Sequence, residues 1–262
     1  MLCYPDRRSA LRAGAAVAAG ALTAACGASG RTDPAPTAPT SAAAPSPAKA
    51  PAVAPAPHRF PGQPVEIGHG PRDRPRVALT FHGNGDPAIA KAILAEAEKG
   101  GARVTVLAIG TWLDAHPEMA RRILDGGHEL GNHTQRHLAV NTMPEAEAYA
   151  EITQCAQRLK RLTGSIGSWF RPSQTRYATP LVRTLAQRAG YPHVLSYDVD
   201  SLDFTSPGAA AVIRTVTGTI RSGSVVSLHF GYADTVAAMP PLLEELARRK
   251  LRAVTTTELL TP

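Results

Sequence analysis

Short runs of apolar residues alternate with longer amphipathic stretches from about residue 65 to the end of the chain. The short runs predict buried strands, and the longer stretches, whose apolar positions recur every three to four residues, predict helices. The expected strands span residues 76–81, 103–109, 129–131, 167–170, 193–197, 224–228 and 252–255. The expected helices span residues 87–99, 118–125, 144–162, 179–189, 207–221 and 235–249. This alternation predicts an α/β fold with helices outside a parallel sheet. Seven units in about 200 residues favour a small barrel over an open sheet, although periodicity alone does not separate the two.

The first 26 residues predict a secretion signal. Arg7 and Arg8 precede an apolar run of small residues at 13–25, which is too short to span a bilayer. The paired arginines suggest twin-arginine export, and the run ends at Cys26 in a sequence that resembles a bacterial lipoprotein box. We therefore expect an exported protein, held at the outer face of the cell membrane by a lipid on Cys26 or, alternatively, secreted.

Residues 27–63 are rich in Ala, Pro, Thr and Ser and carry almost no large apolar side chains. Such a segment cannot bury enough surface to offset the entropy of ordering, and its prolines keep it extended. We expect a linker at 27–63 and one domain at 64–262. Cys155, the single cysteine of that domain, lies among apolar helical positions and is expected in the core.

The formal net charge of +7 raises the question of a nucleic-acid partner. Most of this excess lies before residue 64, because the expected domain holds 22 Lys and Arg against 19 Asp and Glu. Its basic residues are scattered and not interleaved with aromatics, whereas a nucleic-acid-binding surface needs a concentrated basic patch. The charge distribution therefore argues against nucleic-acid binding.

Ionisable side chains directly follow five of the expected strands. They are His82, His133 with His137, Arg171, Asp198 with Asp200, and His229. In a parallel barrel these positions share the carboxyl end of the strands, where the loops build active sites. Because a stable core does not need so many ionisable groups at one edge, the sequence predicts a functional site there.

His133 and His137 are the most specific indication of a metal site in this cluster. Two histidines four residues apart on a helical turn project from one face and can bind one cation, although an isolated pair is more often solvated in a loop. His229 is expected to act as a general acid, because imidazole titrates near neutrality; a hydrogen-bonded core histidine is the simpler alternative. Arg171 and Asp200 are expected to orient these groups, or else to form a structural ion pair.

The same residues, in the same order, resemble the motifs of the polysaccharide deacetylase family, carbohydrate esterases that share the NodB-homology domain. Residues 127–137 resemble the family's GHElGNHT-x-x-H segment, and residues 170–172 resemble its FRPP element. Residues 197–204 resemble its W-x-x-D-x-x-D-W stretch, and residues 225–229 its late L-x-H motif. The resemblance spans residues 76–260.

That resemblance implies a distorted (β/α)7-type barrel and metal-dependent removal of acetyl groups from N-acetylated polysaccharide, either peptidoglycan or a chitin-like chain. In the family the histidines of the H-T-x-x-H motif bind the metal, which corresponds to His133 and His137. The late histidine is the acid, corresponding to His229, and Arg171 and Asp200 correspond to the orienting pair. The metal polarises the amide carbonyl and lowers the pKa of water. Zinc is expected, with cobalt or nickel as alternatives.

The first family motif, T-F-D-D-G-P, is altered in this chain. The gapless match is TFHGNGDP, in which His82 and Gly83 replace the aspartates that serve the family as base and metal ligand. Two repairs are open: His82 completes a three-histidine site with Asp86 as base, or Asp86 binds the metal with His82 as base. A third reading is that Asp86 only caps the next helix, and that the protein is a degenerate relative that binds glycan without cleaving it. The working assignment is a metal on His82, His133 and His137, with Asp86, His229, Arg171 and Asp200 as catalytic residues.

Overall fold

The computed structural model describes residues 53–262, which hold the whole predicted domain. The strands are β1 (Glu66–Ile67), β2 (Arg76–Gly83), β3 (Thr105–Ala108), β4 (Glu129–Asn132), β5 (Val194–Leu195), β6 (Val199–Asp200), β7 (Val225–His229) and β8 (Arg252–Ala253). The helices are α1 (Pro87–Lys99), α2 (Gly110–Ala115), α3 (Glu118–Asp125), α4 (Glu145–Thr163), α5 (Pro180–Arg188), α6 (Ala209–Thr219), α7 (Ala233–Arg248) and α8 (Thr256–Leu260). Two 3-10 turns, η1 (Val140–Thr142) and η2 (Asp203–Thr205), lie between them.

The main sheet is parallel, with the strand order β4-β3-β2-β7-β6. β8 pairs with the start of β2, and β5 pairs with β1. Phe170 forms parallel bridges to both Asn132 of β4 and Val194 of β5, so that it continues the sheet from one to the other. β2 is central, buried on both faces, and this explains its nearly continuous apolar run.

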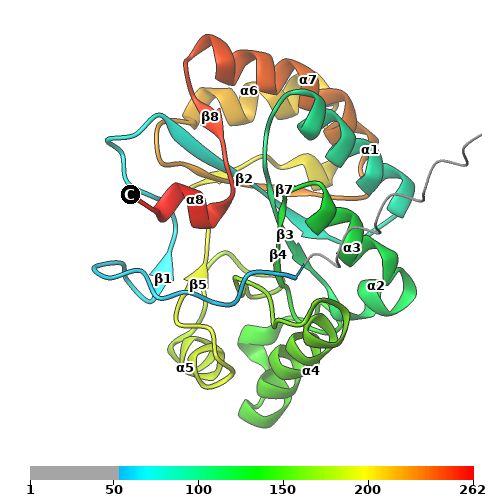
Figure 1. The fold of residues 1–262 in the computed structure, drawn as a ribbon, viewed down its shortest axis with the longest axis vertical. Helices are drawn as coiled ribbons and strands as arrows, with labels where there is room; N and C mark the ends of the chain where they lie inside the picture. Colours follow the sequence, from blue (N-terminus) through cyan, green and yellow to red (C-terminus); the bar gives the residue numbers. More distant parts are fainter. Residues whose placement is uncertain (1–52) are drawn as a thin grey trace, which may run out of the picture. The chain divides into compact units, whose positions relative to one another are not determined.

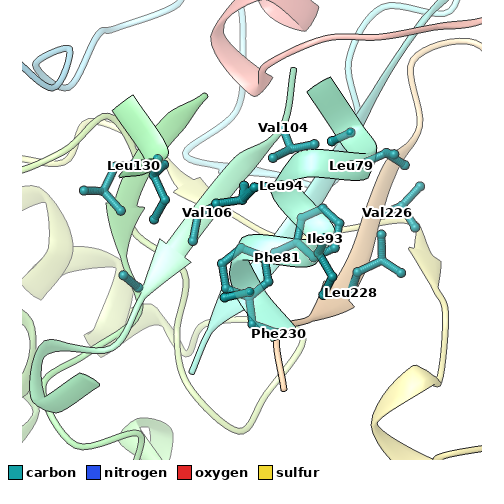
Figure 2. Close-up of a cluster of buried hydrophobic side chains, with 14 of the residues drawn as sticks. Leu79, Phe81, Ile93, Leu94, Val104, Val106, Leu130, Val226, Leu228 and Phe230 are labelled. Atoms are coloured by element: carbon teal, nitrogen blue, oxygen red, sulfur yellow. The ribbon is translucent and has the colours of Figure 1, made fainter. Parts of the chain in front are cut away.

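The long helices cover one face of the curved sheet, and the other face holds a second buried cluster that includes Ala78, Leu107, Trp169 and Val225. In Figure 1, α1, α6 and α7 lie together at one end of the view, and α4 and α5 lie together at the other. Figure 2 shows Ile93 and Leu94 of α1 packed against Leu79 and Phe81 of β2, within one cluster of buried side chains. Each such side chain contributes about 1.5–3 kcal/mol when fully buried. This packing holds β2, and with it the residues at its carboxyl end, in a defined position.

Several short elements differ from the pattern-based expectation. The strand expected at 167–170 is reduced to the bridge at Phe170, because Gly167 has a φ of +83° and breaks the extended run. Helix α2 was not expected, since its six residues begin with glycine and are too few to show helical periodicity. Helix α8 was not expected either; it begins with a capping box formed by Thr255 and Glu258.

The packed part of the chain begins before Pro64. Ala54 and Phe60 are buried, Phe60 stacks on Trp169 with ring centroids 5.5 Å apart, and its backbone N–H donates to His193 Nε2. The predicted signal and most of the predicted linker lie outside the described residues. Within residues 53–262, no helix is both long enough and apolar enough to cross a membrane.

Candidate active site

Three histidines stand at the carboxyl ends of neighbouring strands. His82 lies near the end of β2 and His229 ends β7, and the two are register partners in the parallel ladder. Register partners project from the same face of a sheet, and these rings are 4.4 Å apart between centroids. His133 follows β4, with its ring centroid 4.2 Å from that of His82. The strand ends therefore bring these three predicted residues together.

His137 joins this group through a loop. Ring nitrogens of His82, His133 and His137 all lie within 4.8 Å of one another. The expected helical turn is wrong, because Thr134 and His137 have φ values of 69° and 59°, outside the right-handed helical region. Asn132 Oδ1 accepts the N–H of Thr134, and Thr134 Oγ1 accepts that of His137. These bonds hold the loop in a shape that still turns both imidazoles toward one point.

His133 carries a lone pair that no protein group satisfies. The ring is buried, and its Nδ1 donates to the carbonyl oxygen of Arg171 at 3.0 Å, which places the proton of the neutral ring on Nδ1. Nε2 is buried and has no hydrogen-bond partner among the described residues. Burial, followed by the neighbouring His137, lowers the pKa of His133 well below its usual value. A neutral imidazole with one nitrogen bonded to a carbonyl and the other free is the usual state of a metal-ligating histidine.

Arg171 forms hydrogen bonds with two of the histidines and holds their rings in place. Its side chain is fully buried, where Nε and Nη2 donate to the carbonyl oxygens of Leu195 and Ser196. Burial lowers the pKa of Arg171 to about 10, so it stays charged at neutral pH. Its Nη1 lies 3.1 Å from His82 Nε2, which accepts this bond. Burial and the adjacent His133 lower the pKa of His82 well below the usual value, so this ring is neutral too.

His229 is held by Asp203, a residue that the sequence reasoning missed. Asp203 is buried, and its Oδ1 accepts from His229 Nδ1 at 2.7 Å while its Oδ2 accepts from the His229 N–H and from Thr235 Oγ1. This bond places the ring proton on Nδ1 and leaves Nε2 as the acceptor. The available signal was its place in the stretch 197–204, where Asp203 is the third aspartate and matches the second Asp of the W-x-x-D-x-x-D-W pattern.

The two other aspartates of that stretch have different partners. Asp200 accepts from Tyr197 OH and from the N–H of Leu202, and its charge acts on Arg171 without a direct ion pair. Asp198 forms an ion pair with Arg72 at 2.8 Å, away from the histidines. Among the described residues, Asp200 therefore faces the predicted site but does not contact His229, and Asp203 performs the orienting contact.

The altered first motif supplies no carboxylate to the group formed by His82, His133 and His137. Asp86 is exposed, and its Oδ1 accepts the N–H of Ala88 at 2.7 Å, which makes it the N-cap of α1. Gly83 is the last residue of β2, where a Cβ would lie 2.9 Å from both Ala108 Cα and Val106 Cγ1. A side chain at position 83 would therefore collide with β3. The predicted set is brought together except for Asp86, which lies at the start of the next helix.

Two cavities meet at the histidines. The larger, of about 390 Å³, is lined by Arg176, Tyr197, Asp200 and Phe204, among others, and the smaller, of about 260 Å³, by Asn84, Phe230 and Tyr232 among others. His82, His137 and His229 line both. An extended ligand can therefore lie across the histidines with neighbouring groups on either side.

Residues 69–194 match the family model described as polysaccharide deacetylase. The chain is 31% identical over 194 residues to a peptidoglycan-N-acetylglucosamine deacetylase of Bacillus cereus, covering 72% of this chain and 90% of that protein. It is 29% identical over 196 residues to a chitooligosaccharide deacetylase of Bradyrhizobium sp. (strain ANU 289), covering 66% and 85%. The fold and the histidine site thus define a carbohydrate deacetylase. The chain belongs to the polysaccharide deacetylase family, and the predicted resemblance is confirmed.

Solved structures confirm the predicted fold class. A family 4 carbohydrate esterase (CE4) pseudoenzyme from Bacillus anthracis superposes with a TM-score of 0.72 at 22% identity, covering 76% of this chain and 70% of that one. A peptidoglycan N-acetylglucosamine deacetylase, Bc1960, superposes with a TM-score of 0.70 at 24% identity, covering 75% and 92%. At these identities the likeness concerns the fold alone.

Proposed function

We propose that the protein is a metal-dependent deacetylase that removes N-acetyl groups from a cell-envelope polysaccharide, either peptidoglycan or a chitin-like chain. The observation that carries this proposal is the buried, unpartnered Nε2 of His133 beside ring nitrogens of His82 and His137. The peptidoglycan and chitooligosaccharide deacetylases to which the chain is similar support the substrate class.

The residues that would hold the metal are His82, His133 and His137. Three neutral imidazoles suit zinc, with cobalt and nickel as chemical alternatives. A divalent cation there supplies Lewis-acid polarisation of the acetyl carbonyl and a lowered pKa for water. In the described geometry His82 Nε2 accepts from Arg171, so His82 has to exchange that bond to become a ligand. His133 needs no such exchange, and we rank it as the principal ligand.

Proton transfer falls to His229. Its Nε2 accepts a proton from the attacking water as the water oxygen bonds to the acetyl carbon. Asp203, bonded to Nδ1, stabilises the imidazolium that results. The same Nε2–H then protonates the amine nitrogen as the C–N bond breaks, releasing acetate and a free amino sugar. Asp86 remains a predicted base, but its carboxylate has to leave the helix cap to act.

Arg171 and Asp200 act on this machinery indirectly. Arg171 accepts from His133 through its carbonyl and donates to His82 through Nη1, so that it positions two histidines at once. Asp200 offsets part of the Arg171 charge from the cavity side. We therefore keep an indirect, positioning role for Arg171 and Asp200 as part of the proposal.

A second candidate is a degenerate relative that binds glycan without turnover. The observation that favours it is the replacement of both family aspartates by His82 and Gly83. The fold shared with a CE4 pseudoenzyme is compatible with it.

Acetate release separates the two candidates. The chain without its signal is loaded with zinc, cobalt or nickel and incubated with N-acetylglucosamine oligomers and with peptidoglycan glycan strands. Deacetylase activity predicts metal-dependent acetate release that His229→Ala abolishes. Glycan binding without acetate under every metal establishes the binding protein instead.

We also propose export with a lipid anchor at Cys26. The lipoprotein-like sequence before Cys26 supports it, and a cell-envelope substrate requires an external enzyme. Membrane fractionation of the full chain against Cys26→Ser tests the anchor. Membrane-bound wild type with released variant is the expected result, and equal release of both would contradict it.

A further inference from the structure

An exposed arginine lies at the rim of the larger cavity. Arg176 lines this cavity of about 390 Å³ together with Tyr197, Asp200 and the catalytic His229. Arg176 belongs to the loop that follows Arg171. The segment whose Arg171 bonds to His82 and His133 therefore also places a positive charge beside the larger cavity. Neither the altered first motif nor the proposed chemistry uses this residue.

The guanidinium of Arg176 is held in place by few contacts. Its Nε donates to the carbonyl oxygen of Tyr197 at 3.0 Å, and its central carbon lies 5.2 Å from the Tyr197 ring centroid and 5.1 Å from that of Tyr177. These contacts orient the planar group. Among the described residues, neither Nη atom has a hydrogen-bond partner and no carboxylate forms an ion pair with it. The two outer nitrogens are therefore available to a ligand.

The charges around the larger cavity do not cancel. Asp200 is the one carboxylate that lines it within the described part of the chain, and its charge is opposed by the buried Arg171. The charge of Arg176 is left without a counterion. By contrast, the smaller cavity has no Lys, Arg, Asp or Glu among its described lining residues. An excess positive charge thus lies on one side of the histidines.

We propose that Arg176 binds a carboxylate carried by the glycan, on the sugar next to the acetylated one that is hydrolysed, so that the preferred substrate is an acidic N-acetylated glycan. Guanidinium groups bind carboxylates through two parallel N–H donors, which matches the two free nitrogens. A neutral glycan has no anionic group that could form an ion pair with Arg176. The inference rests on the proposed function, whose substrate class it narrows.

A purely structural role for Arg176 makes a different prediction. Its Nε bond supports the backbone at Tyr197, and losing only that support would weaken all substrates equally. A carboxylate-binding role changes the preference between acidic and neutral substrates. The decisive quantity is therefore the ratio of kcat/KM for an acidic glycan to kcat/KM for a neutral glycan of the same length.

The test compares oligomers of alternating N-acetylglucosamine and N-acetylmuramic acid, which carry free lactyl carboxylates, with N-acetylglucosamine oligomers. In the metal-loaded chain we expect the acidic substrate to be preferred, and Arg176→Gln to lower the preference ratio about tenfold through KM. Arg176→Lys restores part of it, because it keeps the charge and loses the fork. Methyl esterification of the lactyl groups removes the preference in wild type.

Arg214→Gln is the matched control. Arg214 is exposed on α6 and lines neither cavity, so this variant removes the same charge and leaves both activities unchanged. An unchanged ratio in Arg176→Gln, or equal losses on both substrates, overturns the inference while the deacetylase function stands. If no substrate releases acetate, the proposed function fails. Binding of the two oligomer types, measured by calorimetry, then decides the role of Arg176 separately.

Discussion

The carboxylate of Asp203 contacts both the side chain and the backbone of His229, with Oδ1 2.7 Å from Nδ1 and Oδ2 2.8 Å from the backbone nitrogen. Oδ2 also accepts from Thr235 Oγ1, so the buried carboxylate cannot rotate without losing bonds. An aspartate held in this way selects the Nδ1–H tautomer of His229 and stabilises its charged form. It leaves Nε2 as the atom that exchanges protons with the substrate.

Asp203→Asn is therefore expected to lower kcat by about 100-fold or more, because the amide no longer stabilises an imidazolium. Asp200→Asn removes a carboxylate that bonds to Tyr197 and to the N–H of Leu202 and not to His229, and it is expected to lower kcat by less than about tenfold. Steady-state acetate release measures both, with melting temperatures to check folding. An equal or larger loss in Asp200→Asn would assign the orienting role to Asp200, as the sequence suggested.

Asp86 allows a clean separation of helix capping from catalysis. Asparagine caps helices as well as aspartate does but cannot act as a base, whereas alanine does neither. Since Asp86 caps α1, Asp86→Asn is expected to keep the melting temperature and to keep kcat within about threefold. Asp86→Ala is expected to lose about 1 kcal/mol of stability. A large fall in kcat for Asp86→Asn at unchanged melting temperature would restore Asp86 as the base.

The sequence was informative wherever a pattern repeats or a strand is long. The central β2 and the helices around it followed from periodicity, and Cys155 is buried as predicted, with the pKa of its thiol raised to about 12 by burial. Contacts between distant segments could not be read in this way. The hold of Asp203 on His229 joins residues 26 positions apart, and the position of Asp86 depends on how the chain leaves β2. The loop at His133 departs from a helix because of local polar bonds that spacing does not reveal.

Removal of the metal tests the unpartnered nitrogen of His133. A cation that binds only the native state stabilises it by about 2.7 kcal/mol at 100 times its Kd, which for a domain of this size raises Tm by roughly 5–10 °C. We expect EDTA to lower Tm by that amount and zinc to restore it, with no such response in His133→Ala. His116→Ala, a partly exposed histidine outside the cluster, is the control and keeps the response. An EDTA-insensitive Tm in wild type would contradict a metal on these residues.

The metal-free protein is expected to lose stability in mild acid. Burial lowers the pKa values of His82, His133 and His137 below the ordinary value of 6.5. Above pH 6.5 both the native and the unfolded states hold these rings neutral, so their contribution is constant. Below pH 6.5, the histidines bind protons in the unfolded chain, whereas in the native state they stay neutral. For His82 and His133, whose pKa values are lowered most, the free energy of unfolding then falls by up to about 1.4 kcal/mol per pH unit each, until the lowered pKa is reached, and the more exposed His137 contributes less.

Urea unfolding in EDTA at pH 8.0, 6.5 and 5.5 measures this dependence. His133→Gln removes one of the three groups and is expected to reduce the slope between the two lower pH values. A free energy of unfolding that stays level down to pH 5.5 would show that the rings accept protons in the native state, and that their environment is more polar than the buried contacts indicate.

The last prediction concerns Gly83, where the family pattern has a metal-binding aspartate. Side chains alternate along a strand, so position 83 faces the same side as Phe81, toward the buried cluster, while His82 faces the histidines. A Cβ at Gly83 would lie 2.9 Å from Ala108 Cα, which is backbone and cannot move aside cheaply. Restoring the family residue by Gly83→Asp is therefore expected to destabilise the protein and to leave metal affinity and acetate release no higher than in wild type.

Gly83→Ala separates the packing from the charge. It introduces only the Cβ and is expected to cost about 1–3 kcal/mol of unfolding free energy, because the methyl group overpacks the contact with β3. Gly83→Asp costs more, since its carboxylate is also buried without a partner. Thermal unfolding and zinc titration measure both variants. If Gly83→Asp were as stable as wild type and bound zinc more tightly, β2 would have to end before position 83. Position 83 would then have room for a metal-binding aspartate, and the altered motif would mean only that this ligand is missing.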